Sequence, residues 1–548
     1  MKNKNHNVLA LILVLIFSSV IAGQHGSRNE PAPSGLTAAQ WRDDLRYFAD
    51  RMRKTHKNLF FKMSEEEFDA AVAKLDSRIP DLKRHEIIAE LMRIVAMTGD
   101  GHTRLRFELA TGRDGIFPVA FYRFEDGLYV KKAAKEYEEV VGAKILKIGN
   151  DTAESALQKA AELTAADNIM GKKAMAPYLL SIPEITDALG ISAGLDSLSI
   201  TVEKPGGPKV INISRGGELS DLFRSPENWI SARTGSVPLY EKDPQNNYWY
   251  EYLPDTKTVY VKYNAVQNKQ DESIAQFFGK VFEFIEKNPV EKFVIDMRNN
   301  GGGNNTLNRP IYLGLIRSKL NKKGKAFAII GRETFSAAQN GVNKLEELTN
   351  ITFVGEPTAA HPNHYGDAAR ITLPNSKLVV SASTLYWQDL DPRDTRRWTA
   401  PEIAAETTFE DYKLGRDPAL EAVFNFEKGI SYDDLVDEAT NGDFPTFIKK
   451  YREFKKDPRR KYYETQTVMN RFGYELLGQK QIDKAIEVFK LNVEYYPESS
   501  NVYDSLGEAY LEDGKLELAL INYKRSVEID PGNEGGKNAI RKIEQLLN

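Results

Sequence analysis

The sequence predicts an α/β protein whose chain ends in a helical region. From about residue 256 to residue 384, short apolar runs typical of buried strands alternate with amphipathic runs of helical spacing. This alternation favours a layered α/β architecture with crossover connections. After about residue 440 the pattern changes, and four positions recur with a spacing of 34 residues: Gly473 and Gly507, Ala485 and Ala519, Phe489 and Tyr523, Pro497 and Pro531. A repeat of this length is typical of stacked helix–turn–helix units.

The composition limits the classes of protein to which the chain can belong. A length of 548 residues predicts three or four domains, and an apolar content of 41% excludes a wholly disordered chain. The net charge of −4 and the lack of a basic run argue against nucleic acid as the main partner. Cysteine is absent, which excludes disulfides, iron–sulfur clusters, thiolate zinc sites and a cysteine nucleophile.

The N-terminus has the three parts of a secretory signal peptide. A basic start is followed by an apolar run over residues 8–20 and by small residues around Ala22. We expect residues 1–22 to be removed and the protein to be exported, into a bacterial periplasm or out of the cell. The alternative is an uncleaved membrane anchor, although the run is short for a span, which needs about 20 residues. We expect no membrane span after removal of the signal.

Four further regions follow along the chain. Residues 23–105 have helical spacing, residues 110–215 contain strand-like runs with a helical insertion, residues 220–430 hold the strand–helix alternation, and residues 440–548 hold the repeats. The repeats resemble tetratricopeptide repeats, which commonly present a concave face to a protein partner. The alternative is a structural cap on the rest of the chain.

Ser336 is the candidate nucleophile. It follows the apolar run at residues 326–330 and opens a helical run at residues 337–348. A serine at such a turn is exposed, and the free N–H groups at the start of a helix stabilise a developing negative charge. The alternative is a serine that caps the helix, which is common.

A glycine-rich loop follows another buried strand. Residues 296–303 end in three glycines, which allow a sharp turn and present backbone N–H groups at close range. Beside Ser336, such a loop would complete an oxyanion hole; the alternative is a flexible turn. The loop lacks the Lys-Ser/Thr ending of a phosphate-binding loop, which argues against a nucleotide site.

His102 is the candidate general base. It lies in the turn at residues 100–103, after a helical run, from which a side chain can be presented. The alternative is a structural histidine. His361 and His364 are close enough in sequence to form a metal pair, but no third ligand is evident nearby.

These motifs resemble those of the serine peptidase family that contains the carboxyl-terminal processing proteases and the tricorn core protease. Residues 296–303 are similar to the family's Asp-Leu-Arg-x-Asn-x-Gly-Gly segment, residues 334–338 to its nucleophile motif, and residues 355–358 to the strand end that follows. The resemblance covers most of residues 40–425. It implies a crotonase/ClpP-like spiral ββα catalytic core and a PDZ-like module within residues 110–215.

The resemblance favours one branch of that family. The processing proteases pair their serine with a lysine, but His361 stands in that place here. The tricorn branch uses a histidine in an Asp-x-His-Ser/Thr context, which residues 100–103 resemble. That branch's third triad member implies an acid near the end of the domain. Asp394 is the first choice, with Asp391 and Glu402 as alternatives.

The resemblance implies an exported serine-type peptidase, an endopeptidase or carboxyl-terminal processing enzyme, that acts on peptides or proteins without a metal or other cofactor. Ser336 would attack the scissile carbonyl, His102 would take its proton, and Asp394 would orient the imidazole. The alternative is a catalytically inactive peptide- or ligand-binding protein on the same fold, with the repeats as a scaffold.

The expected oxyanion hole consists of backbone N–H groups. Those of Gly302 and Gly303 in the glycine-rich loop and that of Ala337 after the nucleophile would bind the developing negative charge.

Overall fold

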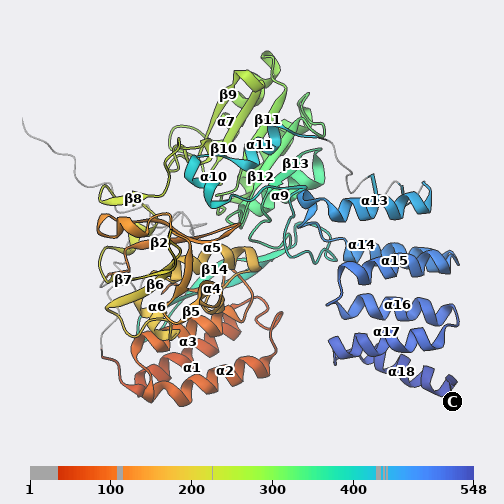
Figure 1. Cartoon of the computed structure of the whole chain (residues 1–548), viewed down its shortest axis with the longest axis horizontal. Helices are drawn as coiled ribbons and strands as arrows, with labels where there is room; N and C mark the ends of the chain where they lie inside the picture. Colours follow the sequence, from red (N-terminus) through yellow and green to blue (C-terminus); the bar gives the residue numbers. More distant parts are fainter. Residues whose placement is uncertain are drawn as a thin grey trace, which may run out of the picture. The chain divides into compact units, whose positions relative to one another are not determined.

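The computed structural model describes residues 35–107, 115–224, 226–427, 434–435, 438–439 and 442–547. The chain forms two units, Met1–Lys428 and Gly429–Asn548. The first mixes helices and sheets and the second is helical (Figure 1), which confirms the predicted α/β class with a helical C-terminal region. The expected signal peptide lies outside the described residues. Within the described ranges, no helix has the length and apolar character needed to cross a membrane.

A six-stranded sheet, in the order β16-β13-β12-β11-β10-β9, forms the centre of the first unit. Its strands are β9 (Tyr248–Leu253), β10 (Thr258–Tyr263), β11 (Lys292–Asp296), β12 (Ala326–Ile330), β13 (Thr352–Gly355) and β16 (Ile403–Ala404). β9 is antiparallel to β10, and the other neighbours are parallel. Because the carboxyl ends of parallel strands meet at one edge, the loops after β11 and β12 are neighbours.

Helices cover both faces of this sheet. On one face, Val259, Val261 and Phe293 pack with residues of α7 (Ile274–Lys287), α8 (Arg309–Arg317) and α9 (Ala337–Leu348). On the other face, Tyr260 and Val294 pack with α11 (Pro418–Phe424), which follows α10 (Phe409–Leu414). Burial on both sides explains why the central strands are mainly apolar on both faces rather than at alternate positions.

The N-terminal helices share one apolar core with distant parts of the unit. They are α1 (Ala38–Thr55), α2 (Glu65–Arg78) and α3 (Arg84–Ala96). Their buried residues join a cluster that also contains residues of a sheet in the order β1-β15-β14. Its strands are β1 (Arg104–Leu105), β14 (His364–Thr372) and β15 (Val379–Trp387). The last strand of the predicted alternation thus lies in this antiparallel sheet and not in the six-stranded one.

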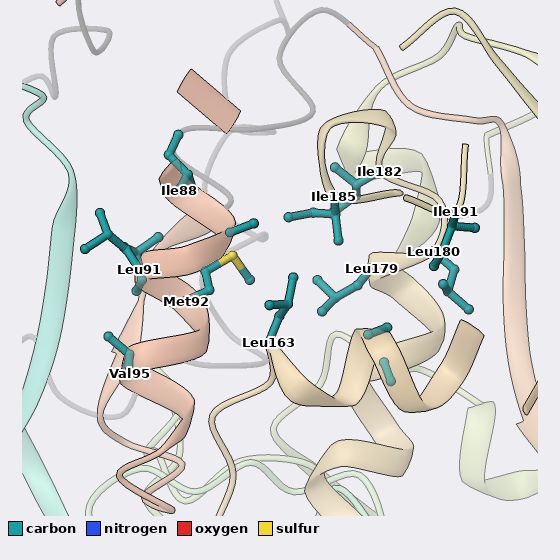
Figure 2. Close-up of a cluster of buried hydrophobic side chains, with 14 of the residues drawn as sticks. Ile88, Leu91, Met92, Val95, Leu163, Leu179, Leu180, Ile182, Ile185 and Ile191 are labelled. Carbon is teal, nitrogen blue, oxygen red and sulfur yellow. The ribbon is translucent and has the colours of Figure 1, made fainter. Parts of the chain in front are cut away.

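Two small antiparallel sheets and three helices lie between β1 and β9 in the sequence. The sheets have the orders β2-β3-β8 and β5-β4-β6-β7. The elements are β2 (Val119–Phe124), β3 (Gly127–Ala134), β4 (Ile145–Ile148), β5 (Asp151–Thr152), α4 (Ala153–Glu162), α5 (Ile169–Leu179), α6 (Pro183–Ala188), β6 (Ser197–Val202), β7 (Lys209–Ser214) and β8 (Trp229–Ser231). Figure 2 shows Leu163, Leu179 and Ile185 from the helical insertion facing Met92 on α3.

The second unit consists of consecutive helices with a separate apolar core. They are α13 (Phe444–Lys456), α14 (Gln466–Gly478), α15 (Ile482–Tyr495), α16 (Ser500–Glu512), α17 (Leu516–Ile529) and α18 (Glu534–Leu547). The repeated glycines have a steric reason. A Cβ on Gly473 would lie 2.4 Å from the Phe489 ring, and one on Gly507 would lie 3.0 Å from the Tyr523 ring. The glycine therefore lets an aromatic residue of the next helix pack against the backbone.

Candidate active site

Ser336 lies at a sharp turn between strand and helix. β12 ends at Ile330 and α9 begins at Ala337. The backbone of Ser336 has φ 53° and ψ −129°, a conformation that is rare for a residue with a side chain. Such a conformation costs roughly 1–3 kcal/mol and is found mainly at functional sites. The side chain makes no capping hydrogen bond to α9, so it does not serve as the helix cap.

The hydroxyl of Ser336 faces His102. Nε2 of His102 lies 2.9 Å from Oγ of Ser336, although the two residues are 234 positions apart. His102 precedes β1, which is held in place by antiparallel pairing with β15. The imidazole also stacks on the ring of Phe335, with 4.4 Å between the ring centres. The fold therefore brings the candidate nucleophile and the candidate base into hydrogen-bond contact.

Asp100 holds the turn that carries His102. Its Oδ1 accepts the backbone N–H of His102 at 2.9 Å, and its Oδ2 accepts the Thr103 hydroxyl at 2.6 Å. Nε2 of His56 lies 3.1 Å from the same Oδ2. Burial alone would raise the pKa of Asp100, but the hydrogen bond from His56 and the other partners hold that pKa well below its ordinary value. Asp100 is therefore a buried, ionised carboxylate.

The environment of His102 keeps its imidazole neutral. Burial lowers the pKa of His102 to about 3, against an opposing effect of the Asp100 charge. Nδ1 of His102 lies 4.0 Å from Oδ1 of Asp100, and this nitrogen has no hydrogen-bond partner in the described part of the chain. A neutral imidazole with Nε2 at the serine hydroxyl is the protonation state that a general base requires.

None of the three predicted acids is bonded to His102. The carboxylate of Asp394 instead accepts the backbone N–H of Arg396 at 3.1 Å and its guanidinium at 2.8 Å. Asp391 and Glu402 are likewise paired with cations other than His102, through ion pairs at 2.7 and 2.6 Å. Geometry thus does not support the role expected for Asp394, because a short loop satisfies its carboxylate locally.

The glycine-rich loop lies against the nucleophile. A Cβ on Gly302, which has φ +110°, would lie 2.7 Å from Cβ of Ser336 and 2.9 Å from the backbone N of Ala337. Only glycine fits this approach. The N–H of Gly302, however, donates to Oδ1 of Asn300 at 3.0 Å. The N–H groups of Gly303 and Ala337 donate to no acceptor among the residues that the structure describes.

Asn300 connects the loop to the nucleophile segment. Its Nδ2 donates to the Tyr263 carbonyl at 3.0 Å, and its own carbonyl accepts the N–H of Phe335 at 3.0 Å. Together with the bond to Gly302, these contacts use its side chain and backbone to fix the loop. The N–H of Gly302, which we expected to bind the oxyanion, is therefore already occupied. The spacing of residues in the sequence did not reveal that the Asn300 side chain turns back onto the loop and accepts this N–H.

A buried network of charged and polar side chains holds the start of the glycine-rich loop. Asp296 is fully buried and accepts hydrogen bonds from Tyr260 at 2.7 Å, Lys262 at 3.2 Å and Arg298 at 3.1 Å. Arg298 makes two further bonds of 2.9 Å to Asp417. Burial would raise the pKa of Asp296, but the cations lower it to about 2. Sequence reasoning missed Lys262, although a lysine within an apolar strand signals a buried partner.

The helical insertion contributes a second missed group, Asp167. Its Oδ1 accepts the N–H of Gly101 at 2.7 Å, and its Oδ2 accepts the N–H of His361 at 3.2 Å. Burial and the nearby Asp100 charge raise the pKa of Asp167. Asp167 therefore connects the turn before His102 to the segment that contains His361, which is distant in the sequence. Nothing in the local sequence distinguishes it from a surface carboxylate.

The two histidines considered as a metal pair are used otherwise. Nδ1 of His364 lies 3.1 Å from the carbonyl of His361, and its ring is parallel to that of His102, with 5.8 Å between the centres. Nδ1 of His361 lies 3.1 Å from the carbonyl of Arg396. In the described part of the chain, no group of three or more His, Cys, Asp or Glu side chains is arranged to hold a metal ion.

Comparison with known proteins identifies the fold. No protein-family model and no curated protein sequence matches the chain. A solved structure of a CPAF point mutant aligns with 72% of this chain and 99% of its own length, at 11% identity and a TM-score of 0.51. The tricorn protease aligns with 71% of this chain and 36% of its own, at 15% identity and a TM-score of 0.36. The likeness to CPAF shows that the two chains share a fold.

A separate match concerns helical repeats. The first TPR of Spaghetti, solved with an HSP90 peptide, aligns with 21% of this chain and 88% of its own length, at 24% identity and a TM-score of 0.16.

Proposed function

We propose that this chain is a serine-type peptidase in which Ser336 and His102 form the reacting pair. One observation carries the proposal: Nε2 of a neutral, buried His102 lies 2.9 Å from the hydroxyl of a serine in a rare backbone conformation. A helix cap or a structural histidine requires neither the strain nor this contact. A nucleophile activated by a general base requires the contact, and strain of this kind is concentrated at active sites.

The reaction uses side chains that are already in position. Ser336 attacks the scissile carbonyl while His102 takes the hydroxyl proton on Nε2, and the resulting imidazolium then protonates the leaving amine. Water repeats the sequence on the acyl-enzyme. Asp100, ionised and 4.0 Å from Nδ1, supplies the negative charge that stabilises the imidazolium. We therefore assign to Asp100, rather than to Asp394, the stabilisation of the imidazolium; Asp100 acts through its charge and through its bond to the backbone N–H of His102, not through a hydrogen bond to Nδ1.

The developing oxyanion would be bound by the N–H groups of Ala337 and Gly303. Loss of one such donor typically costs about 3 kcal/mol of transition-state stabilisation. Gly302 contributes differently from the expectation: it allows the loop to approach Ser336, while its N–H is held by Asn300.

Four finer features belong to the same proposal. We take the six-stranded sheet and its helices as a crotonase/ClpP-like ββα core, and the two small sheets as a PDZ-like module that binds an extended peptide by strand addition. We take the protein to be exported by the signal peptide at residues 1–22. The C-terminal helices would bind a protein partner through repeats like those of tetratricopeptide proteins.

Hydrolysis of a fluorescently labelled unfolded protein tests the proposal. We expect cleavage by the parent protein, and a loss of at least about 1,000-fold in Ser336→Ala and in His102→Ala. Ser77→Ala is the matched control, because Ser77 is exposed and its hydroxyl only donates to the Lys74 carbonyl at 2.9 Å. Equal cleavage by Ser336→Ala would refute the assignment, and binding without any cleavage by the parent would favour the inactive binding protein.

A further inference from the structure

A pocket opens beside the reacting pair. It encloses about 710 Å³ of space, counted out to open solvent. Phe335, the residue before the nucleophile, lines it together with Gly101, the residue before the base, and Gly301 of the glycine-rich loop. A group bound there would therefore lie next to the bond that Ser336 attacks.

One face of α5 forms a wall of this pocket. Gly171, Ala174, Met175 and Tyr178 all line it. These positions have the i, i+3, i+4, i+7 spacing of a single helical face. The wall combines two small residues, which leave space, with an apolar thioether and an aromatic ring.

An adjacent side of α5 faces the protein core. Leu179 is buried there, and Figure 2 shows it directed toward Leu163 and the α3 helix. Met175 and Ala174 are only partly buried. The helix is thus anchored by one side and presents a neighbouring side to the pocket, so the pocket wall is supported by the core.

The charged residues at the pocket already have partners. The guanidinium of Arg332 binds Glu356 at 2.7 and 2.6 Å and the carbonyl of Arg123 at 2.7 Å. Glu333 accepts the Asn299 amide at 3.0 Å. The charge of Arg332 is thus already paired, Glu333 keeps its negative charge with one neutral hydrogen-bond partner, and Phe223 and Phe335 add further apolar surface.

We propose that this face of α5 selects the substrate, by binding a large apolar side chain next to the scissile bond. This inference rests on the proposed function, because a preference in cleavage requires that Ser336 is the nucleophile. Burial of a leucine or phenylalanine side chain then favours substrates that carry one by roughly 10- to 150-fold in kcat/KM over those with glycine or aspartate.

A panel of peptides that differ only at the two residues flanking the scissile bond tests the inference. The parent protein should cleave the leucine, methionine and phenylalanine peptides at least about tenfold better than the others. Ala174→Trp fills the pocket and should lose that preference, whereas Lys172→Trp, on the same helix but outside the pocket lining, should keep it. Met175→Ala enlarges the pocket and should improve cleavage of tryptophan peptides.

Two further readouts separate this inference from the proposed function. Labelling of Ser336 by a small fluorophosphonate shows whether the nucleophile reacts, and it should be unchanged, within about twofold, in the control Lys172→Trp. Binding of the same peptides to Ser336→Ala, measured by fluorescence anisotropy, should show the same apolar preference, and Ala174→Trp in that background should abolish it. Peptide binding without this preference, or a preference that survives Ala174→Trp, would overturn the pocket assignment. A parent protein that is not labelled but binds apolar peptides selectively would overturn only the hydrolase proposal.

Discussion

Ser336 keeps its strained backbone because three neighbouring groups hold it. Phe335 donates its N–H to Asn300, Gly302 packs against Cβ of Ser336, and α9 begins at the next residue. The strain aims the hydroxyl at His102 rather than at the N–H groups of the helix. At this scale, the sequence predicted a serine and a histidine that the fold brings into hydrogen-bond contact. It did not predict Asp100 as the neighbouring acid, because the role of a carboxylate depends on which distant groups pack against it.

Asp100→Asn tests the role of that carboxylate. Loss of the charge should lower the peptidase rate on the order of 100-fold or more, since the imidazolium is no longer stabilised. The measurement is kcat on a peptide substrate, with the pH profile recorded in parallel. Asp394→Asn is the control and should leave kcat within about twofold. The reverse order of effects would return the acid role to Asp394.

The pH dependence of Ser336 labelling should reflect the environment of His102. Burial lowers the pKa of His102 to about 3, and the His364 and Arg104 charges act in the same direction while Asp100 opposes them. The imidazole is basic above its pKa, so the labelling rate should remain high well below pH 6.5, the value for free histidine. Labelling with a fluorophosphonate from pH 4 to 8 measures this, with circular dichroism at each pH to verify folding. A half-maximal rate near pH 6.5 would contradict the described environment.

The loop after β11 shows how elements place the site. Parallel strands β11 and β12 bring residues 297–303 beside the nucleophile, and the Asp296 network holds the base of the loop. The sequence pattern predicted both strands and the loops that follow them, because an apolar run followed by glycine or serine can be recognised from neighbouring positions alone. It did not predict that Asn300 occupies the Gly302 N–H, nor that Asp167 reaches the turn before His102, because both depend on side-chain directions set by packing.

Gly302→Ala tests the close approach of the loop. The added methyl would lie 2.7 Å from Cβ of Ser336 at a φ of +110°, so the loop must shift. We expect the labelling rate to fall at least about 100-fold, with a stability loss of roughly 1–3 kcal/mol. Gly279→Ala is the control: a Cβ there meets no atom within 4 Å, and alanine in helix α7 should stabilise by up to about 1 kcal/mol. Denaturant titration and labelling rates measure both effects.

At the scale of the whole molecule, the two units have separate apolar cores. The core cluster of the C-terminal helices contains only residues after Gly429. The first unit has an apolar core that continues across the boundaries of the predicted domains. Trp41 of α1, Leu163 of the insertion and Ala382 of β15 belong to one cluster. Sequence patterns predicted that the C-terminal region is helical, because the 34-residue period is visible within the region itself. They did not show that the N-terminal helices and the insertion share a core, because that contact joins distant segments.

Truncation after Lys428 tests this division. Every residue that we place in the reacting pair, the oxyanion hole and the α5 pocket precedes this point, so the shortened protein should be labelled at Ser336 within about twofold of the parent rate. A segment of residues 434–548 expressed alone should give a helical circular dichroism spectrum. A loss of labelling of more than tenfold in a truncated protein that remains folded would show that the C-terminal helices take part in the reaction.

The central claim is that Ser336 is a nucleophile activated by His102. Incubation with a fluorophosphonate probe, followed by mass spectrometry of the intact protein and its peptides, tests it most directly. We predict one adduct per chain on the peptide that contains Ser336, and no adduct in Ser336→Ala or His102→Ala. A parent protein that stays unlabelled, or a Ser336→Ala protein that is labelled to the same extent, would contradict it.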